Sequence, residues 1–229
     1  MDIASIRARS GLSLVLAVIV FGSVWGLMEM TLGGFLHTIH FAHKGAVMGG
    51  MAISLMAVFL SVTRRPLLVP ALGLIAASFK PFSAFIFGQP VTSAYVVNPA
   101  TAIFLESLAF ALAAVVLHRA METRVTARIG AGFLAGALGI VLYAAVASTL
   151  GMGKWPVMDL AVKIGTIVDT GVPVALAGSV MLVLGNAAGK FGLPRLSGIS
   201  ALYPRFYHAS LIALVVFCWV IPPVFGLGG

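Results

Sequence analysis

The chain has 229 residues, of which 61% are hydrophobic and only 9% charged, and its mean hydropathy is +1.12. A soluble domain carries about 25% charged residues, so this composition excludes a protein whose whole surface faces water. The formal net charge of +8 does not indicate a nucleic-acid partner, because the basic residues stand at the ends of apolar segments, as in membrane proteins.

Seven apolar segments are long enough to cross a lipid bilayer as helices, since about 20 residues span the hydrocarbon. Their predicted ranges are 11–36, 45–63, 66–88, 97–118, 129–151, 160–187 and 207–226. The sixth is the least regular, because it contains Lys163, Asp169 and Pro173. The predicted fold is therefore all-α: a polytopic transmembrane helix bundle of six to seven spans, with residues 1–229 forming a single transmembrane domain.

The basic side chains predict the orientation of this bundle. With seven spans, ten of the 14 Lys and Arg residues fall on one side of the membrane, whereas the opposite side receives Lys44 and Lys154. Positive residues are retained on the cytoplasmic side, so we expect the N-terminus inside and the C-terminus outside. The ten residues are Arg7, Arg9, Arg64, Arg65, Arg119, Arg124, Arg128, Lys190, Arg195 and Arg205.

Small residues recur at four-residue spacing in three of the predicted spans. In lipid, small residues let helix backbones approach closely. We expect internal packing, and the alternative is a face that docks another membrane subunit. The pairs are Gly22 and Gly26, Gly45 and Gly49, and Gly132 and Gly136.

Four ionisable side chains lie within the apolar spans: Glu29, Lys80, Glu106 and Asp169. At about 1.5 Å of rise per residue, all four are predicted in the outer half of the membrane, at comparable depth. A charge inside the bilayer costs several kcal/mol, so such groups usually pair or line a polar cavity. We therefore expect the four side chains to meet around one cavity, with Asn98 and His37 at its outer mouth.

Irregular backbone is expected beside these charges. Pro81 follows Lys80 and is predicted to kink the third span, and Pro173 is predicted to break or bend the sixth. Such backbone is tolerated at membrane depth where it lines a cavity or is buried in protein. Trp25, Trp155 and Tyr95 are expected as interface anchors, with cavity walls as the alternative.

A set of salt bridges that only holds the bundle together is the alternative to a ligand site. Lys80 paired with Glu29 or Glu106 satisfies that alternative, although buried ion pairs are a weak means of stabilisation. Three acids and one lysine do not balance, however. The remaining carboxylates must be protonated, bound to a metal ion or matched by a cationic ligand.

Histidines at the end of the first span raise the further hypothesis of a metal site. His37 and His40 are three residues apart, on one helical face, and Glu29 lies two turns before His37. Two imidazoles and one carboxylate are a donor set for a divalent metal ion. The alternative is that the histidines are interfacial polar residues. No GxxxxGK[ST], GxSxG or HExxH motif occurs, so we do not expect an enzyme.

Three stretches, WGLMEMTLGGFLH, GLIAASFKPFSAFIFG and NPATAIFLESLAFALAA, cover roughly the first half of the chain. In these and in its size, the chain resembles the substrate-capture (S) subunits of energy-coupling factor transporters. The resemblance implies a helical bundle in a prokaryotic cytoplasmic membrane that binds a vitamin, a cofactor precursor or a metal ion near the outer face. It also implies a transmembrane coupling subunit and two cytosolic ATPases as partners.

The chain departs from that family in two respects. Most S subunits have six spans, and the seven-span members for nickel and cobalt use an N-terminal Met-His element. This chain begins Met1-Asp2-Ile3, so that mode of metal binding does not carry over.

Together these patterns predict a substrate-capture subunit of a transporter. Its ligand is expected to be a cationic or zwitterionic solute or a divalent metal ion, because carboxylates are in excess. The first alternative is a membrane anchor or assembly subunit of a larger complex, such as a redox complex, in which the charges are structural. A proton-coupled transporter with Glu29 and Asp169 as proton carriers is the third hypothesis, and no inverted repeat favours it.

Overall fold

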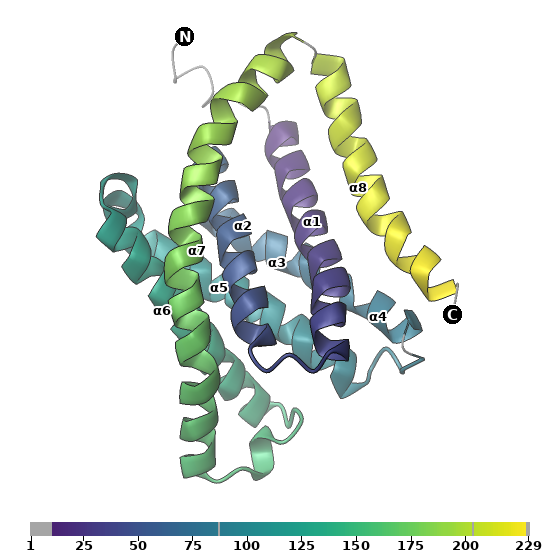
Figure 1. Cartoon of the computed structure of the whole chain (residues 1–229), viewed down its shortest axis with the longest axis vertical. Helices are drawn as coiled ribbons and strands as arrows, with labels where there is room; N and C mark the ends of the chain where they lie inside the picture. Colours follow the sequence, from purple (N-terminus) through teal and green to yellow (C-terminus); the bar gives the residue numbers. More distant parts are fainter. Residues whose placement is uncertain (1–10, 87, 203, 228–229) are drawn as a thin grey trace.

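The computed structural model describes residues 11–86, 88–202 and 204–227 (Figure 1). Helices make up nearly all of these residues, and no strand occurs among them. Seven helical stretches are long and apolar enough to cross a membrane, so the predicted all-α transmembrane bundle is confirmed. These stretches are Leu14–Thr38, Lys44–Thr63, Pro66–Ile86, Ala94–Thr123, Val125–Thr149, Leu160–Gly192 and Arg205–Pro222.

The first, second, fourth, fifth, sixth and seventh spans are each one helix. They are α1 (Gly11–Thr38), α2 (Lys44–Thr63), α5 (Ala94–Thr123), α6 (Val125–Thr149), α7 (Leu160–Leu202) and α8 (Pro204–Leu227).

The third span is divided into η2 (Pro66–Leu68), α3 (Val69–Ala77) and α4 (Lys80–Ile86). Ser78 and Phe79 form a turn between α3 and α4, directly before Lys80 and Pro81. Proline lacks an N–H and clashes with the preceding helical turn, so it is best tolerated in the first turn of a helix. The predicted irregularity in this span is therefore present, and it places Lys80 at the start of α4.

The sixth span differs from the expectation. α7 runs without a break through Gly171 and Pro173, although Pro173 cannot donate a hydrogen bond to the carbonyl of Asp169. Packing against α2 on one side and α6 on the other supports the helix across this point. The predicted break is wrong because tertiary packing outweighs the local cost of the proline.

The helices form a continuous series of neighbours (Figure 1). α7 packs against α2 and α6, α6 packs against α5, α5 packs against α3, and α3 packs against α1. α8 stands at the edge, where it contacts α1 and α4, and little of its surface is buried. The α6–α7 end of the bundle extends beyond the connection between α1 and α2 (Figure 1).

Glycine lets α6 and α7 pack backbone to backbone. A methyl group on Gly132 would overlap the carbonyl oxygen of Gly178, and one on Gly136 would lie 2.8 Å from the Cα of Ala175. Backbone atoms cannot rotate aside as a side chain does. The internal packing predicted for this glycine pair is thus confirmed.

The other two glycine pairs differ from each other. Gly22 and Gly26 on α1 contact the third span closely, against Ile75 and Phe79. Gly45, by contrast, has no atom within 4 Å of the position that a methyl group would take. Packing therefore accounts for the first pair but not for Gly45.

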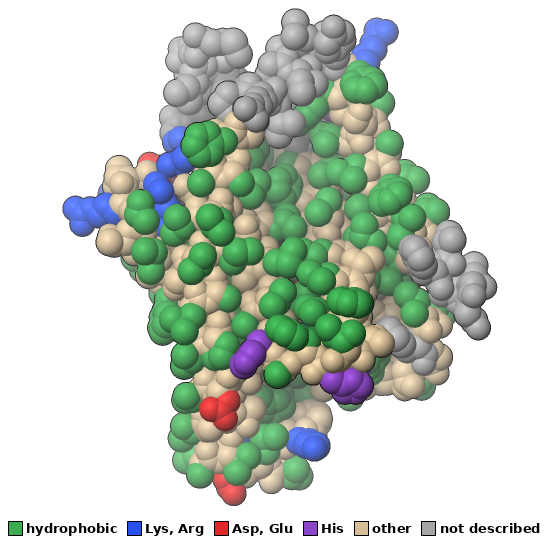
Figure 2. Space-filling model, viewed as in Figure 1, with side chains coloured by type: hydrophobic (Ala, Val, Ile, Leu, Met, Phe, Trp, Pro, Cys, Tyr) green, Lys and Arg blue, Asp and Glu red, His purple; other side chains and the backbone are tan. Residues whose placement is uncertain are grey.

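The two ends of the bundle differ in charge. The α2–η2 and α5–α6 connections lie at one end and carry Arg64, Arg65 and Arg124, and we call this the arginine end. Figure 2 shows Lys and Arg side chains gathered there, and histidines toward the opposite end. The orientation expected from the sequence, in which the arginine end faces the cytoplasm, stays a prediction.

Gly132→Ala is expected to lower the free energy of unfolding by about 1–3 kcal/mol, because its methyl group meets backbone across the α6–α7 contact. Gly130→Ala is the matched control, since no atom lies within 4 Å of its methyl position. Titration of both variants with SDS in mixed micelles measures the difference. Equal stability of the two variants would contradict the close α6–α7 packing.

Candidate functional site

A buried ion pair joins α1 to α4. The Lys80 Nζ lies 3.1 Å from the Glu29 Oε2, and the two side chains are only 10% and 9% exposed. Lys80 Nζ also donates to the Glu29 backbone carbonyl at 3.3 Å, and Trp25 Nε1 donates to Glu29 Oε1 at 3.3 Å. Both carboxylate oxygens of Glu29 are therefore satisfied within the protein.

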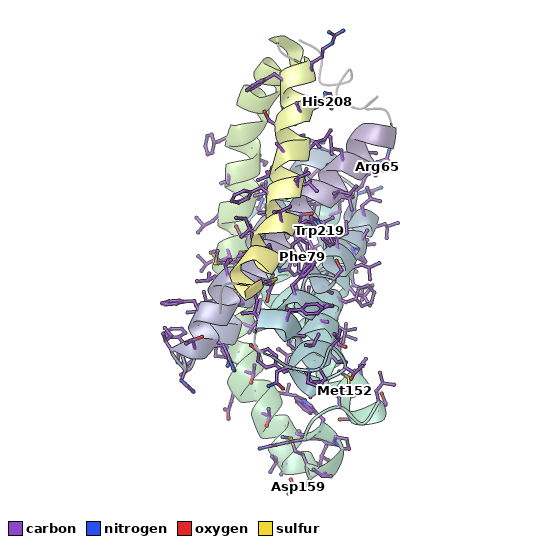
Figure 3. The ribbon with its side chains drawn as sticks, turned by 90° about the vertical axis from the view of Figure 1, so that its right-hand side faces the viewer. Arg65, Phe79, Met152, Asp159, His208 and Trp219 are labelled. Atoms are coloured by element: carbon purple, nitrogen blue, oxygen red, sulfur yellow. The ribbon has the colours of Figure 1, made fainter. Side chains whose placement is uncertain are left out.

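The turn before Lys80 is held by aromatic packing. The Phe79 ring contacts Gly26 on α1, where a side chain would block it. On its other side, Phe79 packs against Trp219 of α8, with ring centroids 4.4 Å apart (Figure 3). Trp219 Nε1 donates to Ser23 Oγ at 2.9 Å. These contacts fix the start of α4 against α1, so Lys80 is directed at Glu29.

Glu106 lies on α5, between a glycine of α2 and a glycine of α6. A methyl group on Gly49 would be 3.8 Å from Glu106 Oε1, and one on Gly139 would be 3.4 Å from Glu106 Cγ. Within residues 11–86, 88–202 and 204–227, no ion pair involves Glu106. Its half-buried carboxylate is thus separate from the Glu29–Lys80 pair.

A cavity of about 310 Å³ opens beside Glu106, between α5, α6, α7 and η3 (Trp155–Val157). Its polar groups are one carboxylate, one amide, two threonine hydroxyls and the polar atoms of two aromatic side chains. The Tyr143 and Trp155 rings meet edge to face, with centroids 6.1 Å apart. The lining residues are Asn98, Pro99, Ala102, Glu106, Gly139, Ile140, Tyr143, Trp155, Thr166 and Thr170.

Helical spacing explains how the cavity wall is built. Asn98, Ala102 and Glu106 follow one another at four-residue intervals on α5, so they share one face. Thr166 and Thr170 have the same spacing on α7. The loop before η3 lies close to Asn98: Gly153 has a φ of +56°, and a methyl group on it would be 3.2 Å from the Asn98 amide nitrogen.

Asp169 does not belong to this cavity, although the sequence predicted it there. It is exposed on α7, on the surface next to the face that carries Thr166 and Thr170. The prediction rested on depth along the span, and depth does not determine the direction in which a side chain points. The depth predicted for Asp169 also assumed that all spans end at the same level of the membrane. The α6–α7 end of the bundle instead extends beyond the connection between α1 and α2 (Figure 1).

The predicted metal ligands His37, His40 and Glu29 are not brought together. α1 ends at Thr38, and His40 lies in the following turn with a φ of 53°, so the two histidines do not share a helical face. Glu29 is engaged by Lys80. Across the described ranges, no group of three or more His, Cys, Asp or Glu side chains is arranged to hold a metal ion.

His37 lies outside the cavity as well. It is exposed, its Nδ1 is 2.9 Å from Lys44 Nζ, and its ring packs edge to face on Tyr95 with centroids 5.6 Å apart. Of the six residues predicted to bind a solute, the cavity therefore contains Asn98 and Glu106.

The sequence analysis missed one wall of the cavity. Gly139 and Tyr143 continue the stripe begun by Gly132 and Gly136, at spacings of three and four residues. That stripe faces other helices along its whole length. Its continuation to residue 143 could therefore have predicted that Tyr143 faces the interior of the bundle. Trp155 was expected as an interface anchor, and the structure places it in the wall.

Comparison of the chain with models of known protein families, with curated proteins and with solved structures finds no match.

Lys80→Met is expected to lower the free energy of unfolding by about 3–5 kcal/mol, because it leaves the Glu29 carboxylate buried without a cation. Arg64→Met is the control, since the Arg64–Glu122 pair is exposed and its loss should cost about 1 kcal/mol or less. SDS titration in mixed micelles measures both.

The double variant Glu29→Gln/Lys80→Met removes both charges and should recover much of the loss. A Lys80→Met protein as stable as the control would show that the pair is not a buried constraint.

Proposed function

We propose that the chain is a substrate-capture subunit of a membrane transporter and that the cavity between α5, α6, α7 and η3 binds a small organic cation. The observation that carries this proposal is Glu106, a carboxylate beside a cavity of about 310 Å³ with no ion pair to any described residue. Ligand pockets for small molecules have volumes of about 300–1,000 Å³.

The cavity offers what an alkylammonium group requires. Glu106 supplies the opposite charge, and the faces of Tyr143 and Trp155 attract a cation through their ring quadrupoles. Lys80 does not neutralise Glu106, because its ammonium group is hydrogen-bonded to Glu29. The aliphatic parts of a ligand would contact Ile140, Ala102 and Pro99.

The lining favours an organic cation over the other two predicted ligand classes. Protein sites for divalent metal ions combine several carboxylates, imidazoles or thiolates, whereas this cavity lining contains one carboxylate and no His or Cys. A zwitterion needs a basic partner for its own carboxylate, and the cavity lining contains no Lys, Arg or His.

The resemblance to S subunits adds the expected partners, a transmembrane coupling subunit and two cytosolic ATPases, and the expectation that the chain itself is not an enzyme. An assembly subunit is the second candidate. It is favoured by the Glu29–Lys80 pair, in which the two charges satisfy each other and hold α1 to α4.

Binding can be tested with tetramethylammonium on the purified protein, with tryptophan fluorescence as the readout because Trp155 lines the cavity. Glu106→Gln is expected to weaken binding about tenfold or more, since it removes the opposite charge. Asp169→Asn is the control and should bind as the wild type does, because Asp169 is exposed outside the cavity.

Trp155→Phe should abolish the fluorescence change and so assign it to the cavity. Uncharged tert-butanol, which has a similar shape, should bind far more weakly than tetramethylammonium. Equal affinity of the wild type and Glu106→Gln would refute the cation site and favour the assembly subunit.

A further inference from the structure

Two short connections meet at the arginine end of the bundle. Arg64 and Arg65 link α2 to η2, and Arg124 links α5 to α6. Arg64 Nη1 lies 3.4 Å from the Oε1 of Glu122, which is in the last turn of α5, so one ion pair joins the two connections. They therefore form one continuous surface.

Positive charge is in excess on this surface. Residues 64–65 and 118–128 contain five arginines and a single acid, Glu122. Arg128 is used within the fold, since its Nε donates to the Met121 carbonyl at 2.7 Å and its Nη2 donates to the Glu122 carbonyl at 3.0 Å. Arg65, Arg119 and Arg124 are exposed, and none forms an ion pair with an acid of the described chain.

Large apolar side chains are exposed directly beside these arginines. Leu67 is 79% exposed two residues after Arg65, and Val116 is 75% exposed one turn before Arg119. In Figure 2, hydrophobic side chains adjoin the Lys and Arg side chains at this end. An acidic soluble protein would not cover such apolar groups at membrane depth. A lipid covers both kinds of surface, because its phosphate and its acyl chains are joined.

The backbone adds to the positive potential. α6 begins after Arg124, and its start has no side-chain hydrogen bond to cap it. Uncapped N–H groups at a helix start favour a nearby anion. The start of α6 is thus preceded by Arg124, an exposed arginine that a phosphate can reach.

We propose that Arg64, Arg65, Arg119 and Arg124 bind the phosphate group of an anionic phospholipid, whose acyl chains lie over Leu67 and Val116. This site is at the opposite end of the bundle from the loop before η3, and it does not depend on the proposed transport function. An arginine near a membrane surface strengthens the binding of anionic lipid about fivefold.

The test compares phosphatidylglycerol with phosphatidylcholine of the same acyl chains. Each lipid is titrated into the purified full chain in detergent, and native mass spectrometry counts the lipid bound. The wild type is expected to prefer phosphatidylglycerol by about tenfold or more. In the variant Arg65→Gln/Arg119→Gln/Arg124→Gln this preference should fall to near one.

The matched control is Lys44→Gln/Lys154→Gln/Lys163→Gln, which removes three positive charges outside the arginine end and should keep the preference. If the triple arginine variant does not fold, the three single variants serve, each with a preference lowered about fivefold. Three results would overturn the proposal: an unchanged preference in the arginine variants, loss of the preference in the lysine control, or equal competition by inorganic phosphate. A polyglutamate peptide that displaces the lipid at equal concentration would also overturn it and assign the surface to an acidic protein.

Discussion

The ion pair between Glu29 and Lys80 is the constraint on which the rest of the structure depends. Removing two charges from water costs several kcal/mol for each, and attraction repays this only where the remaining hydrogen-bonding groups are also satisfied. Here Trp25 donates to one carboxylate oxygen while Lys80 bonds the other. The pair requires a turn before Lys80, a glycine at position 26 to admit Phe79, and Trp219 to cover that ring. The ion pair thus lies where the third span is divided, and the contact of α8 with Phe79 supports it.

The same pair determines the chemistry of Glu106. If Lys80 were shared between the two acids, the cavity would be lined by a neutralised carboxylate and would have little preference for a cation. Because the aromatic contacts direct Lys80 at Glu29, Glu106 has no ion pair among the described residues, and we propose that it pairs with a ligand instead. The two flanking glycines leave space beside the carboxylate, and Tyr143 and Trp155 supply the remaining walls. The sequence left a structural role and a ligand-binding role as alternatives for the buried acids. Glu29 has the structural role, and we propose the ligand-binding role for Glu106.

Hydropathy and charge were sufficient to predict the architecture, because the bilayer fixes the length of each span and charges mark its ends. The predicted pairing of distant charges was also informative for Glu29 and Lys80. Side-chain direction was not predictable for Asp169, because its depth along the span says nothing about which face of α7 it occupies, and that face is exposed. The metal hypothesis failed because α1 ends at Thr38. His40 is therefore not on the helical face that carries His37. Tyr143 was missed because an aromatic residue that continues a glycine stripe is read as ordinary packing.

The most direct test of the central claim is a crystal structure of the protein soaked with tetramethylarsonium, whose arsenic atom is located by anomalous scattering. The account predicts an arsenic peak in the cavity between Glu106, Tyr143 and Trp155, within about 6 Å of both ring centroids, with Lys80 still bonded to Glu29. A structure in which Lys80 bonds Glu106 and the cavity holds no arsenic would contradict it.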